Sequence, residues 1–273
     1  MDRHGPWHIV ETPNFQVCCQ HSAAPAAHVA RHAETLRNIL CVAWLGAETI
    51  GEWKPKCQIV LYSNRQSYVA AVGRGGERTV GSSLVKHDKG RTMFRRIDLL
   101  GNGTEYLSAA LPHELTHIIL RDRFPSTVVP RWADEGMAIL ADTEAKQKRH
   151  RRDLQQALAQ RRTFHAVELL TMEEYPASNR FGVFYGQSAS LTGFLVSRKG
   201  SNRFVEFIDR AEKAGYDAAL QECYGIDGVG ELDRQWRTCR YLVQPAMYEQ
   251  ITKATAKPTQ LRSASESSQP YSR

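Results

Sequence analysis

The sequence of 273 residues predicts an α+β fold, in which a mixed α/β lobe with a small sheet precedes a mainly helical lobe. Short β-branched and apolar runs alternate with helical patterns over residues 7 to about 103. Helical periodicity then dominates residues 104 to about 248. With a hydrophobic content of 42%, the chain can bury a full core. We therefore expect a single domain over residues 7–248, made of these two sublobes.

Three strands and two helices are expected in the N-terminal lobe. The strands are predicted near Phe15, near Ile59 and from Thr92 to Ile97. The helices are predicted from about Pro25 to Leu45 and across Arg65 to Val72. Together these elements predict a small sheet with covering helices.

The segment His113-Glu114-Leu115-Thr116-His117 lies in an apolar stretch and is expected on a helix between the two lobes. A spacing of four residues places His113 and His117 on the same helix face, so both imidazoles can reach one metal ion. Pro112 is unfavourable inside a helix, so the pattern predicts either a kink there or a helix start near Leu111. A core helix whose histidines only satisfy hydrogen bonds is the alternative.

A second segment supplies a candidate third ligand. Catalytic zinc sites commonly use three protein ligands and keep one position for water. Residues 121–126 carry the charges and the proline expected past a helix end, and Pro130 is placed to begin the next helix. Glu135 on that helix can present a carboxylate to the metal. The spacing thus allows Glu135 to complete a Zn²⁺ site with His113 and His117.

These two motifs together resemble the gluzincin zinc metallopeptidases, in particular the small peptidase MA-like domains. The similarity is carried by the HELTH segment and by the Trp-Ala-Asp-Glu-Gly-Met-Ala run that starts at Trp132. It implies a thermolysin-like zincin fold with the Glu of the Glu-Gly pair as third ligand, which is Glu135 here. It also implies that an edge strand, expected within Val80 to Leu99, pairs with an extended peptide substrate. A weaker similarity extends over most of residues 7–242.

The chemistry of such a site assigns further roles. Glu114 is expected to act as general base and then general acid, because it lies beside the ligands without being one of them. Related enzymes use a tyrosine or histidine downstream of the third ligand to bind the developing oxyanion. Tyr185 is the candidate here and His165 the second. The alternative for Tyr185 is a place on the apolar face of a helix.

Metal-bound histidines usually donate their second N–H to a carboxylate or carbonyl. Thermolysin-like relatives supply an aspartate one turn beyond the glutamate ligand, where this chain has Ile139. Asp142 and Asp134 are the two candidates for this supporting role. At both positions a plain surface carboxylate is the alternative.

A formal net charge of +7 raises the question of an anionic partner. The densest basic stretch runs from Lys146 to Arg152, but no nucleic-acid motif accompanies it. Its interleaved glutamines, leucines and alanines favour a solvated helix. We therefore expect a peptide or protein substrate and no nucleic-acid partner.

The remaining expectations concern location and the chain end. No run of about 18 apolar residues is present, so no membrane span is predicted. The start lacks an apolar signal region, which predicts a cytoplasmic protein as written. A longer start that carried a signal peptide would make the protein secreted or periplasmic. Residues 253–273 are polar and predict a disordered tail.

Three functional hypotheses follow. The first is a zinc-dependent peptidase, with a weak preference for endopeptidase action. The second is a catalytically weak relative that binds zinc and peptide. The third is a basic module for binding protein or nucleic acid, in which the HELTH helix is only structural.

Overall fold

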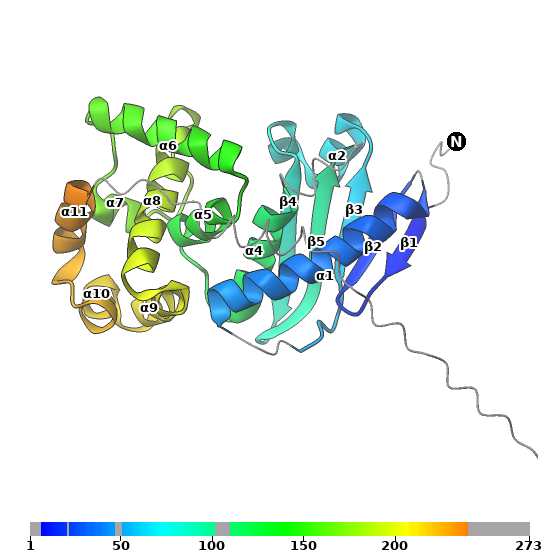
Figure 1. The fold of residues 1–273 in the computed structure, drawn as a ribbon, viewed down its shortest axis with the longest axis horizontal. Helices are drawn as coiled ribbons and strands as arrows, with labels where there is room; N and C mark the ends of the chain where they lie inside the picture. The colour runs from blue at the N-terminus through cyan, green and yellow to red at the C-terminus, as the bar shows by residue number, and fades with distance from the viewer. Residues whose placement is uncertain (1–6, 21, 47–50, 102–109, 240–273) are drawn as a thin grey trace, which may run out of the picture.

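The computed structural model describes residues 7–20, 22–46, 51–101 and 110–239, which form two lobes (Figure 1). A sheet with its covering helices makes up one lobe, and helices alone make up the other. This is the predicted α+β arrangement of a small mixed sheet followed by a mainly helical part. The predicted lobe boundary near residue 103 and the predicted tail over 253–273 lie outside the described residues.

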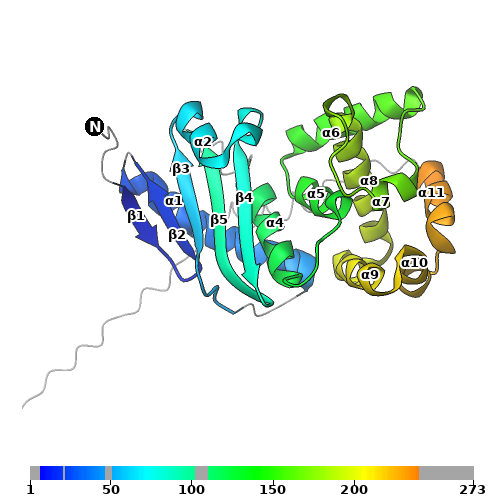
Figure 2. The ribbon, with the colours of Figure 1, turned by 180° about the vertical axis from the view of Figure 1, so that it is seen from behind.

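Within the described residues the sheet has five strands in the order β1-β2-β3-β5-β4. They are β1 (His8–Glu11), β2 (Phe15–Cys19), β3 (Cys57–Tyr62), β4 (Gly81–Asp88) and β5 (Arg91–Leu100). Strands β2, β3 and β5 run parallel, while β1 and β4 pair antiparallel at the two edges. The three predicted strands are confirmed, and β1 is an addition whose four residues are too few to give a clear pattern. The edge strand β4 lies within the predicted stretch and faces the helical lobe (Figure 2).

Helices cover both faces of the sheet, and the core on one face is larger than the core on the other. Helices α1 (Ala23–Leu45) and α4 (Leu111–Arg123) cover one face, and α2 (Arg65–Val72) covers the other (Figures 1 and 2). Because side chains alternate along a strand, Ile59 belongs to the main core while Val60 packs with Tyr68 in a small second core. The sheet is therefore anchored from both sides.

Two helices connect the lobes, and proline marks the start of each. Helix α4 (Leu111–Arg123) has Pro112 in its first turn, where a missing N–H removes no intrahelical hydrogen bond. The predicted helix start near Leu111 is therefore the correct one of the two alternatives. Helix α5 (Arg131–Leu140) follows Pro130 directly, as expected. The two helices pack against each other, and α4 also packs against the edge strand β4.

The C-terminal lobe is built around one central helix, α8 (Phe181–Lys199). Its helices are α6 (Glu144–Ala159), α7 (Ala166–Leu170), α8 (Phe181–Lys199), α9 (Ser201–Ala214), α10 (Tyr216–Tyr224) and α11 (Gly228–Cys239). Short 3-10 turns occur at η1 (Arg74–Glu77) and η2 (Ser178–Arg180). Helix α8 packs against α5, α6 and α9 (Figure 1).

One hydrophobic core extends through both lobes and includes Ile97 of the sheet and Phe184 of α8. This continuity favours the prediction of a single domain, which stays a prediction for residues 7–248. In the part of the chain that the structure describes, no helix combines the length and the apolar character that crossing a membrane requires.

Candidate metal centre

The two histidines of the HELTH segment lie side by side on α4, which contacts both β4 and α5. The centroids of the His113 and His117 rings are 4.9 Å apart. Both side chains are partly buried and line one large cleft between the lobes. The spacing of four residues therefore gives the shared helix face that the sequence predicted.

Glu135 reaches the same point from α5. The ligand atoms of His113, His117 and Glu135 all lie within 4.8 Å of one another. Nε2 of His113 is 3.7 Å from Oε2 of Glu135, whose residue is only 7% exposed. The structure thus brings together the three residues that the sequence singled out as ligands.

The position of Glu135 depends on how tightly α5 packs. Trp132 on α5 is fully buried and its ring meets that of Phe204 on α9 edge to face. Gly136 faces α8, where a Cβ atom would lie 2.2 Å from Oγ1 of Thr192 and 2.7 Å from the carbonyl oxygen of Ser188. A larger residue after Glu135 would push the two helices apart. The glycine of the Glu-Gly pair is therefore a packing requirement.

Two imidazole nitrogens and one carboxylate oxygen are a donor set that suits Zn²⁺. The residues present therefore fit a zinc ion, which His113, His117 and Glu135 would hold.

Each histidine also contacts a carboxylate through its other nitrogen. Nδ1 of His113 lies 3.2 Å from Oδ2 of Asp142, and Nδ1 of His117 lies 2.8 Å from Oδ1 of Asp134. Neither aspartate is a plain surface carboxylate, and each meets a different histidine. An N–H at Nδ1 that donates to these carboxylates leaves Nε2 as the free lone pair for a metal.

These carboxylates also change the protonation of the histidines. Burial acts to lower the pKa of His113, but Asp142 outweighs it and the net pKa is raised. Burial likewise opposes the change at His117, where Asp134 and then Glu135 raise the pKa to about 10. Since a protonated imidazole cannot bind a metal, protons and metal compete for this site.

Glu114 lies beside the ligands but faces β4. Its Oε2 accepts a hydrogen bond of 2.8 Å from Oγ of Ser83, and the residue is 9% exposed. A Cβ atom at Gly81 would lie 2.7 Å from Oε1 of Glu114. The edge strand therefore approaches Glu114 closely, and one carboxylate oxygen is held by a hydroxyl.

Tyr175 is a site residue that the sequence analysis missed. Its hydroxyl donates a hydrogen bond to Oε1 of Glu135. Its ring contacts Phe184 and Tyr185, and the guanidinium of Arg131 lies 4.6 Å from its centroid. Burial, followed by the charge of Glu135, raises the pKa of Tyr175, so the hydroxyl keeps its proton. No spacing rule links a loop tyrosine to a helix carboxylate 40 residues earlier.

Tyr185 on α8 lines the cleft at the side of the ligands. Burial raises the pKa of its hydroxyl, and the charges of Glu135 and Glu114 raise it further. Among the described residues its hydroxyl has no hydrogen-bond partner and is not enclosed. The ring of Tyr185 therefore packs with apolar neighbours, as the alternative expected, while its hydroxyl remains available in the cleft, as an oxyanion donor requires.

His150 on α6 is a second residue that the sequence analysis missed. Its ring centroid lies 5.7 Å from that of Tyr185, and it lines the same cleft. Nδ1 of His150 is buried without a hydrogen-bond partner in the described structure. Burial lowers the pKa of His150 to about 4, so the imidazole is neutral at neutral pH. An N–H at Nδ1 would be a buried donor without an acceptor, so the proton is expected on Nε2. Nε2 then provides a second donor in the cleft besides the hydroxyl of Tyr185.

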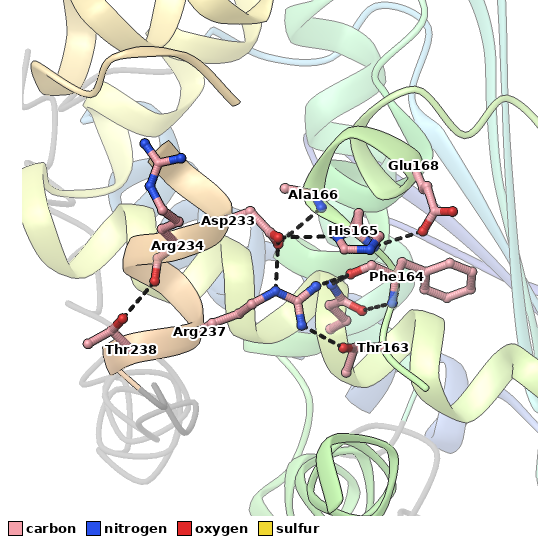
Figure 3. A network of polar contacts seen from close by, with 10 residues as sticks. Thr163, Phe164, His165, Ala166, Glu168, Asp233, Arg234, Arg237 and Thr238 are labelled. Carbon is pink, nitrogen blue, oxygen red and sulfur yellow. Dashed lines mark hydrogen bonds and ion pairs between the residues drawn. The ribbon is translucent and has the colours of Figure 1, made fainter. Parts of the chain in front are cut away.

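His165 is placed elsewhere. It precedes α7, and its Nδ1 lies 3.4 Å from Oδ2 of Asp233 on α11, in the polar network of Figure 3. Arg237 binds the same aspartate, and the cleft lining does not include His165. Its environment is that of a residue that joins α7 to α11.

The cleft that contains these groups measures about 1890 Å³. Strand β4 forms one wall, and α6, α8 and the loop with Tyr175 form the other. The ligand-bearing helices α4 and α5 form its floor. A volume of this size accommodates an extended peptide of several residues.

Comparison with protein families identifies the group to which the chain is related. The profile of the peptidase MA superfamily matches residues 88–242, which is more than half of the chain. The chain belongs to the peptidase MA superfamily. No curated protein matches the sequence. The superfamily match runs from the end of β4 to the end of α11, and it covers all three candidate ligands and both aspartates. Membership indicates a peptidase-type protein with a peptide or protein as substrate.

Proposed function

We propose that this protein is a zinc-dependent metallopeptidase of gluzincin type with a thermolysin-like catalytic fold. The observation that carries the proposal is the convergence of His113, His117 and Glu135 within 4.8 Å, with a separate carboxylate, Glu114, beside them. Three ligands and one adjacent base are the minimum set for metal-assisted peptide hydrolysis.

His113, His117 and Glu135 would hold a zinc ion, which would supply a Lewis acid to lower the pKa of a water molecule and polarise a substrate carbonyl. Glu114 accepts the proton of the attacking water and passes it to the leaving amine. Ser83 orients one oxygen of Glu114, which leaves the other to handle the proton. Tyr185 donates a hydrogen bond to the oxygen of the substrate carbonyl as negative charge develops there.

The substrate is held by backbone pairing. β4 is the last strand of the sheet and has no further strand at its outer side in the described chain. An extended peptide can add to such an edge by main-chain hydrogen bonds. Because Gly81 and Ser83 contact Glu114, a peptide bound there presents its backbone to the base.

The proposal is tested by metal analysis and turnover together. We expect about one zinc per chain, and loss of that zinc in Glu135→Ala. Glu114→Gln should keep the zinc but reduce hydrolysis of a mixed peptide library by about 10² to 10⁴ fold. A chelator should abolish the activity of the natural chain.

Each alternative gives its own result in this experiment. Zinc binding without any turnover supports a catalytically weak zinc- and peptide-binding protein. Absence of zinc supports a structural HELTH helix in a basic interaction module. Loss of zinc in Glu114→Gln contradicts the role of Glu114 as base.

A further inference from the structure

The cleft continues past Glu114 toward the segment that precedes β4. Gly81 and Ser83 contact Glu114, so the start of β4 lies at the proposed base. Residues 74–80, which come just before β4, therefore extend the same wall, and all of them line the cleft. The start of α6 forms the facing wall, because Asp142 lies just before this helix and contacts His113. In Figures 1 and 2 the segment between α2 and β4 and helix α6 lie along the same edge of the molecule.

Both walls carry arginines at this end of the cleft. Arg74 and Arg78 on the β4 side and Arg149 on α6 line the cleft and are exposed. None of these three has an ion pair with an acidic residue in the described part of the chain. Lys146 adds a fourth cation, which is paired with Asp142 at 3.0 Å. Glu77 lies in the same segment and also lines the cleft, but none of the three arginines pairs with it, so within the described residues the three cations outnumber this one carboxylate.

The other end of the cleft has a different character. Beyond the middle of β4 it is lined by Leu84, Val85, Val128 and Val129, together with Arg121. Val128 is 72% exposed and Leu84 is 46% exposed, which leaves apolar surface open to a ligand. The candidate metal centre thus lies between a cationic end and a largely apolar end.

We propose that the cationic end, formed by Arg74, Arg78 and Arg149, is a subsite for carboxylate groups of the peptide substrate. This inference rests on the proposed function and names its substrate class, peptides with Asp or Glu on one side of the cleaved bond. A strand advances about 3.3 Å per residue, so side chains a few residues from that bond reach these arginines. Arginine binds carboxylates through paired N–H groups, and several cations in one cleft attract anionic ligands.

A peptide suits this surface better than a nucleic acid. The arginines stand beside an unpaired strand edge, and strand edges bind extended peptides through their backbones. A carboxylate can come from an acidic side chain or from the free C-terminus of a peptide. Probes with amidated and free C-termini separate these two sources.

The test measures peptide binding in zinc-loaded Glu114→Gln, which removes turnover from the measurement. Two fluorescent peptides are compared by anisotropy, one with a run of Glu residues and one with Gln at the same positions, each with an amidated C-terminus. The cleft variant carries Arg74→Gln, Arg78→Gln and Arg149→Gln. A control variant with the same change in charge carries Arg31→Gln, Arg152→Gln and Arg161→Gln, all exposed and outside the cleft lining.

We expect the Glu peptide to bind at least about tenfold more tightly than the Gln peptide, with a preference that weakens at high salt. The cleft variant should lose most of this preference, and the control variant should keep it. Equal binding of the two peptides, or an equal loss in both variants, would overturn the proposal. A preference that appears only with free C-termini would assign the subsite to the terminal carboxylate. Equally tight, arginine-dependent binding of a single-stranded RNA would show a nucleic-acid site instead.

The subsite and the peptidase activity can fail separately. If the natural chain hydrolyses Glu and Gln peptides at equal rates, the proposed peptidase function stands and the proposed carboxylate subsite is contradicted. Arginine-dependent binding of the Glu peptide without hydrolysis of any peptide would support the subsite and contradict the peptidase.

Discussion

The floor and the walls of the cleft differ in how their polar side chains are held. On the floor each functional side chain already has a polar partner within the protein: His113 with Asp142, His117 with Asp134, Glu135 with Tyr175 and Glu114 with Ser83. On the walls the hydroxyl of Tyr185, His150 and the arginines of the cationic end have no such partner in the described structure.

This difference separates two tasks. A metal centre needs ligands whose rotamers and tautomers are fixed before the metal arrives, and buried hydrogen bonds provide that order. Groups that bind a substrate must keep their hydrogen-bonding capacity free until the substrate is present. Apart from Glu114, which is the proposed base, substitutions on the floor should therefore change metal binding, and substitutions on the walls should change turnover at constant metal content.

After the proposed base, the largest effect is expected at the wall. Tyr185→Phe should lower kcat by about 10² to 10³ fold and leave zinc content unchanged, because it removes a donor to the oxyanion and no ligand. Zinc analysis and peptide hydrolysis on the same sample measure both quantities. Tyr224→Phe is the matched control, since its hydroxyl is buried without a partner and lies outside the cleft lining. Unchanged kcat would show that Tyr185 takes no part in hydrolysis. Loss of zinc would show that Tyr185 supports the metal ligands instead.

The two aspartates test the floor. Removing a carboxylate that orients a histidine ligand typically weakens metal affinity by about 10 to 100 fold. Asp142→Asn should lie at the upper end of that range and Asp134→Asn at the lower end. The reason is exposure, because the side chain of Asp142 is 3% exposed and that of Asp134 is 26% exposed. Competition with a chromogenic chelator measures zinc affinity, and Asp209→Asn on α9 serves as control. The reverse order of the two effects would contradict the argument from burial.

The floor is also the part that the sequence predicts well. His113, Glu114 and His117 share one helix, so a rule for a single helix places them. Glu135 lies on the next helix along the chain, and the intervening turn is short enough for the two helices to pack. The aspartates could be named but not assigned to particular histidines, because this depends on the angle between α4 and α5. The position of α5 depends on buried contacts of Trp132 with α9 and of Gly136 with α8, which no local pattern reveals.

The walls were harder to predict because their residues come from separate segments. Tyr175 lies in a loop, His150 lies in a basic helix that the sequence presents as solvated, and Ser83 lies in an edge strand. His165 has the right residue type and order but is held against Asp233, away from the cleft. The strands and most helices follow from local periodicity. The presence of Tyr175, His150 and Ser83 in one cleft depends instead on how the sheet packs against α4 and how α6 packs against α8.

Tyr175 tests whether a loop residue belongs functionally to the floor. Tyr175→Phe keeps the ring among its aromatic neighbours but removes the hydrogen bond to Glu135. Zinc affinity should fall by about tenfold, because the carboxylate loses the partner that orients it. Stability of the metal-free protein, measured by urea unfolding, shows whether the substitution acts only on the fold. A drop in stability with unchanged zinc affinity would make the hydrogen bond purely structural.

The smallest effect concerns His150 and acid stability. Burial lowers its pKa to about 4, whereas histidine in an unfolded chain titrates near 6.5. Between these values the unfolded chain binds a proton that the folded protein excludes, so this residue makes stability fall as pH drops from about 6.5 to 4. His150→Asn should therefore reduce the loss of unfolding free energy between pH 7 and pH 5.5 by about 1 kcal/mol. Urea unfolding with a chelator present measures this difference, with exposed His28→Asn as control. Equal pH dependence in the natural chain and His150→Asn would mean that water reaches His150 in the folded protein and that burial does not exclude the proton from its imidazole.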